Sequence, residues 1–163
     1  TAEPNSSPVA LTFTRDVAAP ATLLFDLVDD PEAQRAWRDG LVDTVATSGH
    51  TRDAPVGATF VQRVRMAGRL VAWQVEILAW ERPRRIAVRV GVGPVRVDVR
   101  WRFEALDGGG SRLTWSAEPS GGGLLQRLSG PAVGFFGARA LAGQVAALAA
   151  LAERRARKGL SDG

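Results

Sequence analysis

Alternating apolar and polar residues divide most of the chain into predicted β-strands. The clearest run is 95–106, where charged residues alternate with Val95, Val97, Val99, Trp101 and Phe103. A period of two residues over this length has no helical explanation and is typical of a strand with one buried face. The same alternation predicts strands over 9–17, 41–47, 57–66, 70–80, 85–92 and 112–118, separated by segments rich in turn residues.

Apolar residues at helical spacing predict three helices. The first two are short, over 21–28 and from 30 to about 37, and Asp30 and Pro31 supply the second with a carboxylate cap and a first-turn proline. The third begins at Pro131, ends near residue 157 and has on one face Val133, Gly137, Leu141, Gln144, Leu148 and Leu151. A separate short turn or kink is expected just before it, at the out-of-phase residues Leu124, Leu125 and Leu128.

The order of these elements predicts an α+β helix-grip fold. Short connections make the later strands antiparallel neighbours, so we expect a curved sheet of about seven strands wrapped on the long C-terminal helix. One face of the sheet is charged and faces water, and the other is apolar, rich in Trp and able to cover the helix. We expect a single domain over 9–157, with flexible ends at 1–8 and 158–163.

The composition excludes several kinds of site. The chain has no cysteine, which rules out disulfides, thiolate chemistry and cysteine-ligated metal, and its single histidine argues against a histidine-based metal site. We therefore expect neither a metal nor a cofactor. No apolar run approaches the ~18 residues that a membrane span needs, and no signal peptide is recognisable, so we expect a cytoplasmic protein.

The charge is basic but mixed. The net charge is +4, and nearly all the cations are Arg, a usage that a GC-rich, actinobacterial-like genome favours for neutral reasons. Acidic residues are interleaved with the arginines, which argues against a nucleic-acid partner. On the outer face of the predicted sheet, cross-strand pairing with acids explains the arginines, and the alternative is a docking surface for an acidic carrier protein or nucleic acid: Arg63, Arg65, Arg89, Arg96, Arg100 and Arg102.

Several short motifs carry a resemblance to a known family. They are Ala19-Pro20, Leu24 to Val28, Asp30-Pro31-Glu32, Trp37, Gly57, Glu81 to Ile86, and Ser111 to Trp115. With these motifs the chain, over about 9–155, resembles the START-like superfamily (Bet v 1-like, SRPBCC), and more narrowly its polyketide cyclase/dehydrase and lipid-transport group. The motifs mark turns and element ends, so the resemblance implies the helix-grip fold far more strongly than an activity.

A bent sheet under a single helix leaves room for a small hydrophobic ligand. The expected lining is Phe60, Gln62, Val64, Met66, Trp73, Val75, Val88, Val90, Val99, Trp101, Phe103, Trp115, Phe136, Ala140, Leu141 and Gln144. Ordinary core packing is the simpler interpretation of any one of them. Two observations favour a cavity: several indole N–H groups on one face need partners when buried, and Gly137 and Ala140 are small where a packed helix favours Leu.

Polar candidates for catalysis are few: Gln144, Gln62 and His50. Burying an unpaired amide costs about 1–3 kcal/mol. Each glutamine therefore bonds a neighbour, reaches water or contacts a ligand. The alternative is that its side chain does not point inward as the pattern predicts. Histidine suits general base catalysis near neutral pH, but His50 has no partner identifiable from sequence, and a solvated loop residue is the simpler interpretation. The same holds for three further residues that could lie at the cavity mouth, Arg38, Asp39 and Asp53.

Three functions are compatible with this sequence. The first is binding of a hydrophobic or aromatic small molecule, such as a polyketide or lipid. The second, implied by the resemblance, is a polyketide cyclase/aromatase-type enzyme that needs no cofactor and folds and dehydrates a poly-keto substrate. The chain contains no tyrosine, which removes a common acid/base group and argues against chemistry beyond templating. The third is an interaction protein that uses the arginine-rich outer face. The sequence leaves the ligand and the oligomeric state undetermined.

Overall fold

A computed structural model describes residues 11–51, 53–120 and 131–162, with the side chains of 131–139 excepted. The element order is β1 (Leu11–Val17), α1 (Ala21–Asp29), α2 (Pro31–Gln34), β2 (Leu41–Ala46), β3 (Thr59–Met66), β4 (Arg69–Glu81), β5 (Arg85–Val92), β6 (Val95–Ala105), β7 (Ser111–Pro119) and α4 (Pro131–Ser161). The predicted order of strand, two short helices, six strands and long helix is confirmed. The leucines of 124–128, expected in a short turn, lie outside the described residues.

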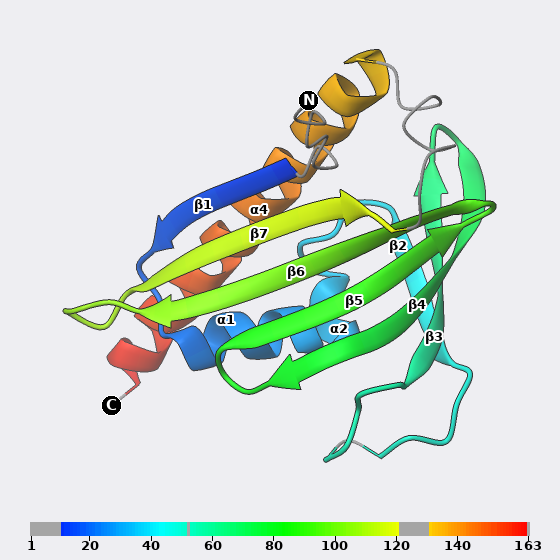
Figure 1. The fold of residues 1–163 in the computed structure, drawn as a ribbon. Helices are drawn as coiled ribbons and strands as arrows, with labels where there is room; N and C mark the ends of the chain where they lie inside the picture. The colour runs from blue at the N-terminus through cyan, green and yellow to red at the C-terminus, as the bar shows by residue number, and fades with distance from the viewer. Residues whose placement is uncertain (1–10, 52, 121–130, 163) are drawn as a thin grey trace, which may run out of the picture.

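The strands form one curved antiparallel sheet that wraps around the helices (Figure 1). Its order is β1-β7-β6-β5-β4-β3-β2, so each strand from β2 to β7 pairs with its neighbour in sequence and β1 closes the sheet beside β7. The helices lie on the concave side of the sheet (Figure 1). Helix α4 lies behind β1, β7 and β6, and α1 and α2 lie near the half of β5 that follows the turn from β4. The α+β helix-grip prediction is therefore confirmed.

Local chemistry fixes the helical corner after β1. Asp30 caps α2 as predicted, because its side chain accepts a hydrogen bond of 3.0 Å from the backbone N–H of Glu32. The helix is shorter than expected and ends at Gln34. Beyond it, the indole N–H of Trp37 donates to the carbonyl of Leu27 at 2.9 Å, which ties the turn back to α1.

Two register shifts bend the sheet. One lies between Leu41 and Asp43 in β2, and the other between Ile77 and Ala79 in β4. Such bulges increase local twist and change which side chains face inward. Gly40, with φ of +83°, precedes the first shift, and a Cβ there would lie 2.5 Å from the carbonyl oxygen of Arg65, so only glycine fits.

The packed core occupies one end of the grip, where α1 and the C-terminal half of α4 meet the sheet. Its fully buried side chains come from α1, β6, β7 and α4: Leu24, Phe25, Leu27, Phe103, Leu113 and Leu148. The predicted apolar face of α4 contributes Leu148 and Leu151 here, whereas Leu141, nearer the start of the helix, is only half-buried. The apolar face thus packs tightly at one end only, and the helix continues four residues past its predicted end.

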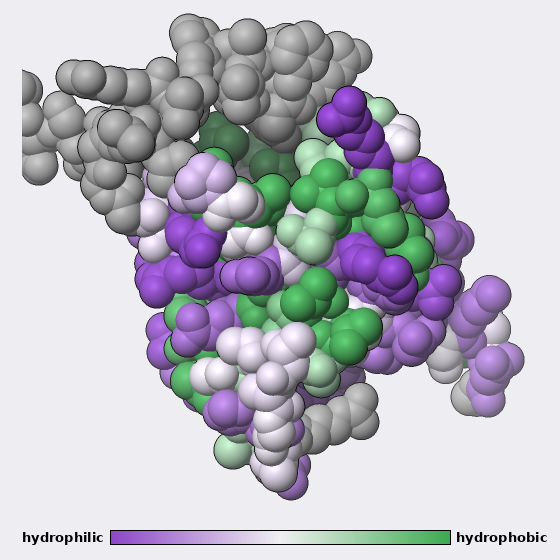
Figure 2. Space-filling model, turned by 90° about the vertical axis from the view of Figure 1, so that its right-hand side faces the viewer, coloured by the Kyte–Doolittle hydropathy of each residue, from purple (hydrophilic) through white to green (hydrophobic). Residues whose placement is uncertain are grey.

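Cross-strand ion pairs account for much of the charged outer face. Arg63 pairs with Asp43, Arg89 with Asp98, Arg100 with Glu118 and Arg112 with Asp16. Three of these pairs are directly opposite in register, as expected for a solvated antiparallel face. Around β2 and β3, polar and apolar residues are interspersed on the surface (Figure 2), and the exposed large apolar side chains include Val45, Val56, Met66 and Leu70.

These pairs predict acid sensitivity. The hydrogen bonds from Arg112 and Arg63 lower the pKa of Asp16 and Asp43 below the ordinary value of 3.8. Because the pKa is lower in the folded state, the ionised pairs stabilise the fold above pH 3.8, and this stability is lost as the pH falls through the folded-state pKa. Urea unfolding of wild type should show this decline, and Asp16→Asn/Asp43→Asn should make it shallower. An equally steep decline in the double variant would contradict this assignment.

Candidate functional site

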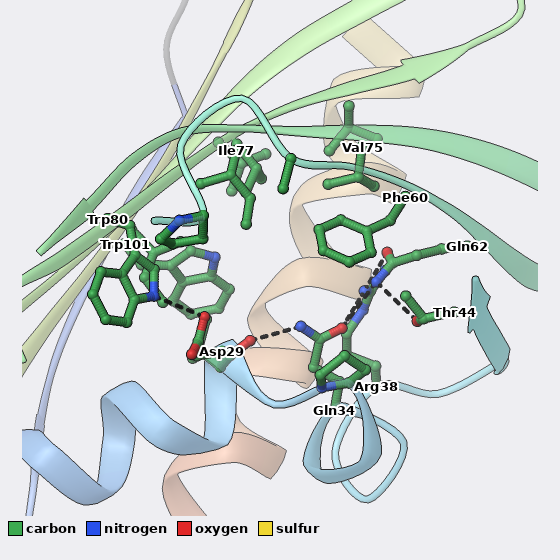
Figure 3. A pocket seen from close by; sticks show the side chains of 18 of the residues that line it. Asp29, Gln34, Arg38, Thr44, Phe60, Gln62, Val75, Ile77, Trp80 and Trp101 are labelled. Atoms are coloured by element: carbon green, nitrogen blue, oxygen red, sulfur yellow. Dashed lines mark hydrogen bonds between the residues drawn. The ribbon is translucent and has the colours of Figure 1, made fainter. Parts of the chain in front are cut away.

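A cavity of about 440 Å³ lies between the concave face of the sheet and the helices. It is bounded by β3 to β7, by the corner between α1 and α2, by the loop before β3 and by the first described side chains of α4 (Figure 3). Ligand pockets in proteins commonly have volumes of about 300–1,000 Å³. The space beneath the helix is therefore open where the packed core ends.

The sheet wall of the cavity is apolar and aromatic. Its residues are Phe60, Trp73, Val75, Ile77, Trp80, Ile86, Val88, Val90, Val99, Trp101 and Trp115. Edge-to-face contacts fix the tryptophans: the ring of Trp101 lies 5.7 Å from that of Trp37 and 6.3 Å from that of Trp115. All five tryptophans of the chain line the cavity, so this wall is both hydrophobic and rigid.

One polar cluster interrupts the apolar lining, at the side formed by α2 and β3 (Figure 3). Gln62 is 6% exposed and shares its amide among three neighbours: its oxygen accepts from Nη1 of Arg38 at 2.7 Å, and its Nε2 donates to Oε1 of Gln34 at 2.9 Å and to Thr44 at 3.3 Å. Gln34 in turn donates to the carbonyl of Val28 at 2.6 Å. The cluster is therefore held from three different elements.

Arg38 is the charged member of this cluster. Its Nη1 also donates to Oε1 of Gln34 at 3.2 Å, and its guanidinium carbon lies 5.5 Å from the centre of the Trp73 ring, a cation–π arrangement. Burial lowers the pKa of Arg38 to about 10, so the side chain remains a cation at neutral pH.

Two indole N–H groups at the cavity differ in how they are satisfied. Trp80 donates to Oδ1 of Asp29 at 3.0 Å, a bond that is visible in Figure 3. The Nε1 of Trp73 is fully buried and has no hydrogen-bond partner in the described part of the chain. A buried donor without a partner costs free energy, but because this nitrogen is fully buried it does not face the open space of the cavity.

The mouth of the cavity contains His50 and Thr51 from the loop before β3. His50 is exposed, and its Nδ1 lies 3.1 Å from the hydroxyl of Ser48. Its other ring nitrogen is next to Gly57, where an added Cβ would lie 3.2 Å from it. The histidine is therefore a rim residue and contacts none of the members of the polar cluster by a hydrogen bond.

Comparison with known families places this geometry in context. The model of the polyketide cyclase / dehydrase and lipid transport family matches residues 8–153. The chain belongs to this family. The resemblance inferred from the sequence motifs is thereby confirmed, and among curated proteins no sequence matches the chain.

Solved structures related to this family share the fold at low sequence identity. A START superfamily protein from Mycobacterium smegmatis aligns with a TM-score of 0.71 at 16% identity, over 91% of this chain and 97% of that protein. Ginseng major latex-like protein 151 from Panax ginseng aligns with a TM-score of 0.68 at 12% identity, over 88% and 97%. These identities support a shared fold and leave the ligand open.

The di-domain ARO/CYC protein StfQ, from the steffimycin biosynthetic pathway, is a further structural neighbour. It aligns with a TM-score of 0.70 at 23% identity, over 89% of this chain. This chain covers 45% of StfQ, so the likeness extends to less than half of that protein.

Most of the residues predicted to line a cavity in this family member do surround it. They are Phe60, Gln62, Trp73, Val75, Val88, Val90, Val99, Trp101, Trp115, Leu141 and Gln144. His50 lies at the rim, and Arg38, expected only at the mouth, forms part of the polar cluster. Gln62 bonds to neighbours, whereas Gln144 is half-buried and forms no hydrogen bond with another described residue.

Four predicted lining residues lie elsewhere, and one is not described. Met66 ends β3 at the surface with 47% exposure, and Ala140 is exposed on α4. Val64 and Phe103 are buried but do not line the cavity, and of the two only Phe103 belongs to the packed core. Strand alternation gives the face of a residue but not its position along the sheet, which explains the differences for the strand residues. The side chain of Phe136 lies outside the described residues.

Sequence reasoning missed the lining from the helical corner and from the end of β4. Gln34, Trp37 and Trp80 line the cavity but were not predicted to do so. The bulge between Ile77 and Ala79 turns Trp80 inward, out of phase with the rest of β4. The sequence did predict the α2 helix that contains Gln34. Which face of that helix points to the cavity is defined only by the tertiary structure.

Two features are absent from the part of the chain that the structure describes. Within 11–51, 53–120 and 131–162, no group of three or more His, Asp or Glu side chains is arranged to hold a metal ion. Over the same ranges, no helix combines the length and the apolar character needed to cross a bilayer.

Proposed function

We propose that this protein binds a hydrophobic or aromatic small molecule, polyketide-like or lipid-like, in the cavity between the sheet and α4. The observation that supports this most strongly is a 440 Å³ space walled by aromatic and aliphatic side chains, with one hydrogen-bonded polar cluster among the polar groups that line it. Such a lining buries an apolar body and uses a small number of polar contacts to orient it. The family to which the chain belongs is consistent with this role.

A fluorescence titration tests the proposal. Because every tryptophan lines the cavity, the neutral probe N-phenyl-1-naphthylamine should quench tryptophan emission as its own emission rises, with one saturable site in the micromolar range. Trp101→Ala should weaken binding by about tenfold, since it removes a central part of the wall. Saturation at several sites, or no quenching, would contradict the proposal.

A cyclase is the second candidate function, favoured by the family description and by the polar cluster. A guanidinium and amide groups beside an apolar chain could hold a poly-keto substrate in a folded shape and stabilise an enolate oxygen. The tyrosine-free composition and the position of His50 at the rim argue for templating over acid–base chemistry. If this protein is a cyclase, a poly-β-keto thioester should give cyclised product, Arg38→Met or Gln144→Leu should lower turnover by a larger factor than it lowers probe affinity, and His50→Ala should leave turnover unchanged.

A further inference from the structure

Arg38 differs from the paired arginines of this protein in the nature of its partners. The arginines on the outer face bond carboxylates, as Arg63 does with Asp43 and Arg89 with Asp98. Arg38 bonds only neutral amide oxygens, those of Gln34 and Gln62, and forms no ion pair with any carboxylate in the described ranges. It is therefore a half-buried positive charge that no carboxylate of the described residues neutralises by an ion pair.

The surroundings of Arg38 make this charge expensive to keep. It lines an apolar cavity, and burial alone lowers the pKa of its guanidinium. Moving a charge away from water without a counterion is unfavourable, and a methionine of similar length would fill the site without this cost. A cation at this cavity without a carboxylate partner is therefore suited to a negative charge that arrives with the ligand.

The hydrogen-bonding groups of the cluster lead to the same conclusion. Both amide oxygens are already occupied as acceptors for Nη1 of Arg38, and Gln62 Nε2 and Gln34 Nε2 donate within the protein. The Nε and Nη2 of Arg38 form no hydrogen bond with another described residue, and neither is among the fully buried polar atoms without a partner, so both are accessible to a ligand. The guanidinium therefore has donors to spare at the cavity.

We propose that Arg38, positioned by Gln34 and Gln62, binds the carboxylate of an amphipathic ligand whose apolar body occupies the tryptophan-lined wall. A planar guanidinium suits a carboxylate, because its parallel N–H groups can donate to both oxygens. This inference rests on the proposed binding function and narrows it from hydrophobic molecules in general to hydrophobic carboxylic acids.

Competition with two nearly isosteric compounds tests the inference. With N-phenyl-1-naphthylamine as the reporter, 1-naphthaleneacetate and its neutral amide, 1-naphthaleneacetamide, are titrated as displacers. In wild type we expect the acid to displace the reporter at a concentration at least about tenfold lower than the amide does. In Arg38→Met the ratio of the two displacing concentrations should fall to about one, whatever the affinity of this variant for the reporter.

Two further variants make the test specific. Arg35→Met removes an exposed arginine three residues away, paired with Glu32 on the surface, and should leave the preference for the acid unchanged. Trp73→Phe keeps a ring beside Arg38 and removes only a fully buried N–H, and should also leave the preference for the acid unchanged.

The outcomes separate this inference from the proposed function. If wild type binds the reporter but the acid and the amide displace it at equal concentrations, the carboxylate site is refuted and the binding function stands. The assignment to Arg38 is equally refuted if Arg38→Met folds, binds the reporter and retains the preference. If wild type does not bind the reporter at all, the proposed function fails and this inference fails with it.

Discussion

Replacing Val88 by tryptophan is expected to reduce the affinity for N-phenyl-1-naphthylamine by at least about 100-fold. Val88 lies in the middle of β5, opposite Ile77 on one side and Val99 on the other, and all three side chains line the cavity. An indole at this position would extend into open space and occupy much of the volume that a ligand needs. Because it displaces no packed side chain, the melting temperature should stay equal to or above that of wild type.

Val45→Trp is the matched control for this prediction. Val45 is 53% exposed on β2 and does not line the cavity, so the same substitution there should leave probe affinity unchanged. Probe fluorescence measures both variants, since each adds a tryptophan. Unaltered affinity in a folded Val88→Trp variant would show that the probe binds somewhere other than this cavity.

Replacing Phe25 by alanine is expected to lower the free energy of unfolding by about 3–5 kcal/mol. Phe25 is fully buried, and its ring lies 5.6 Å from that of Trp80 and 5.9 Å from that of Phe103. It joins α1 to β4 and β6 at the closed end of the grip, where the surrounding side chains cannot collapse into the vacated space. Urea unfolding, followed by far-ultraviolet circular dichroism, measures the change.

Phe60→Ala provides the contrast. Phe60 is half-buried and already borders the cavity, so its removal enlarges an existing space and should cost about 1–2 kcal/mol. Equal losses of stability in Phe25→Ala and Phe60→Ala would mean that the two ends of the grip are packed alike, which contradicts the division between core and cavity.

The sheet could be predicted from the sequence because most of its strands have one wet and one dry face. In β6 the charged residues show which side chains face water, and the predicted inward residues Trp101 and Phe103 are indeed buried, with 9% and 2% of their surface exposed. Turn residues between the strands fixed the meander. The same physics located the helix, since an apolar face of that length has to be covered.

The position of the cavity along the grip could not be predicted in the same way. Phe103 and Trp101 share a face of one strand and both belong to the buried core, yet only Trp101 also lines the cavity. The difference depends on where α1 and α4 meet the sheet, which is a property of the tertiary structure. A single bulge in β4 likewise decided that Trp80 faces inward.

The polar cluster illustrates a further limit. Gln62 was identifiable as a polar residue on an apolar face, but its partners come from residues 18 to 28 positions away in the sequence. Arg38 stood out in the sequence only as a charge near a helix end. Its role follows from what it lacks in three dimensions, which is a carboxylate within the described structure.

The most direct test of ligand binding inside the grip is a nuclear magnetic resonance titration of the five indole N–H signals. Because all five tryptophans border the cavity, N-phenyl-1-naphthylamine should shift these signals together, with one saturable dissociation constant equal to that from fluorescence. Indole signals that stay in place while the probe is demonstrably bound would contradict the account.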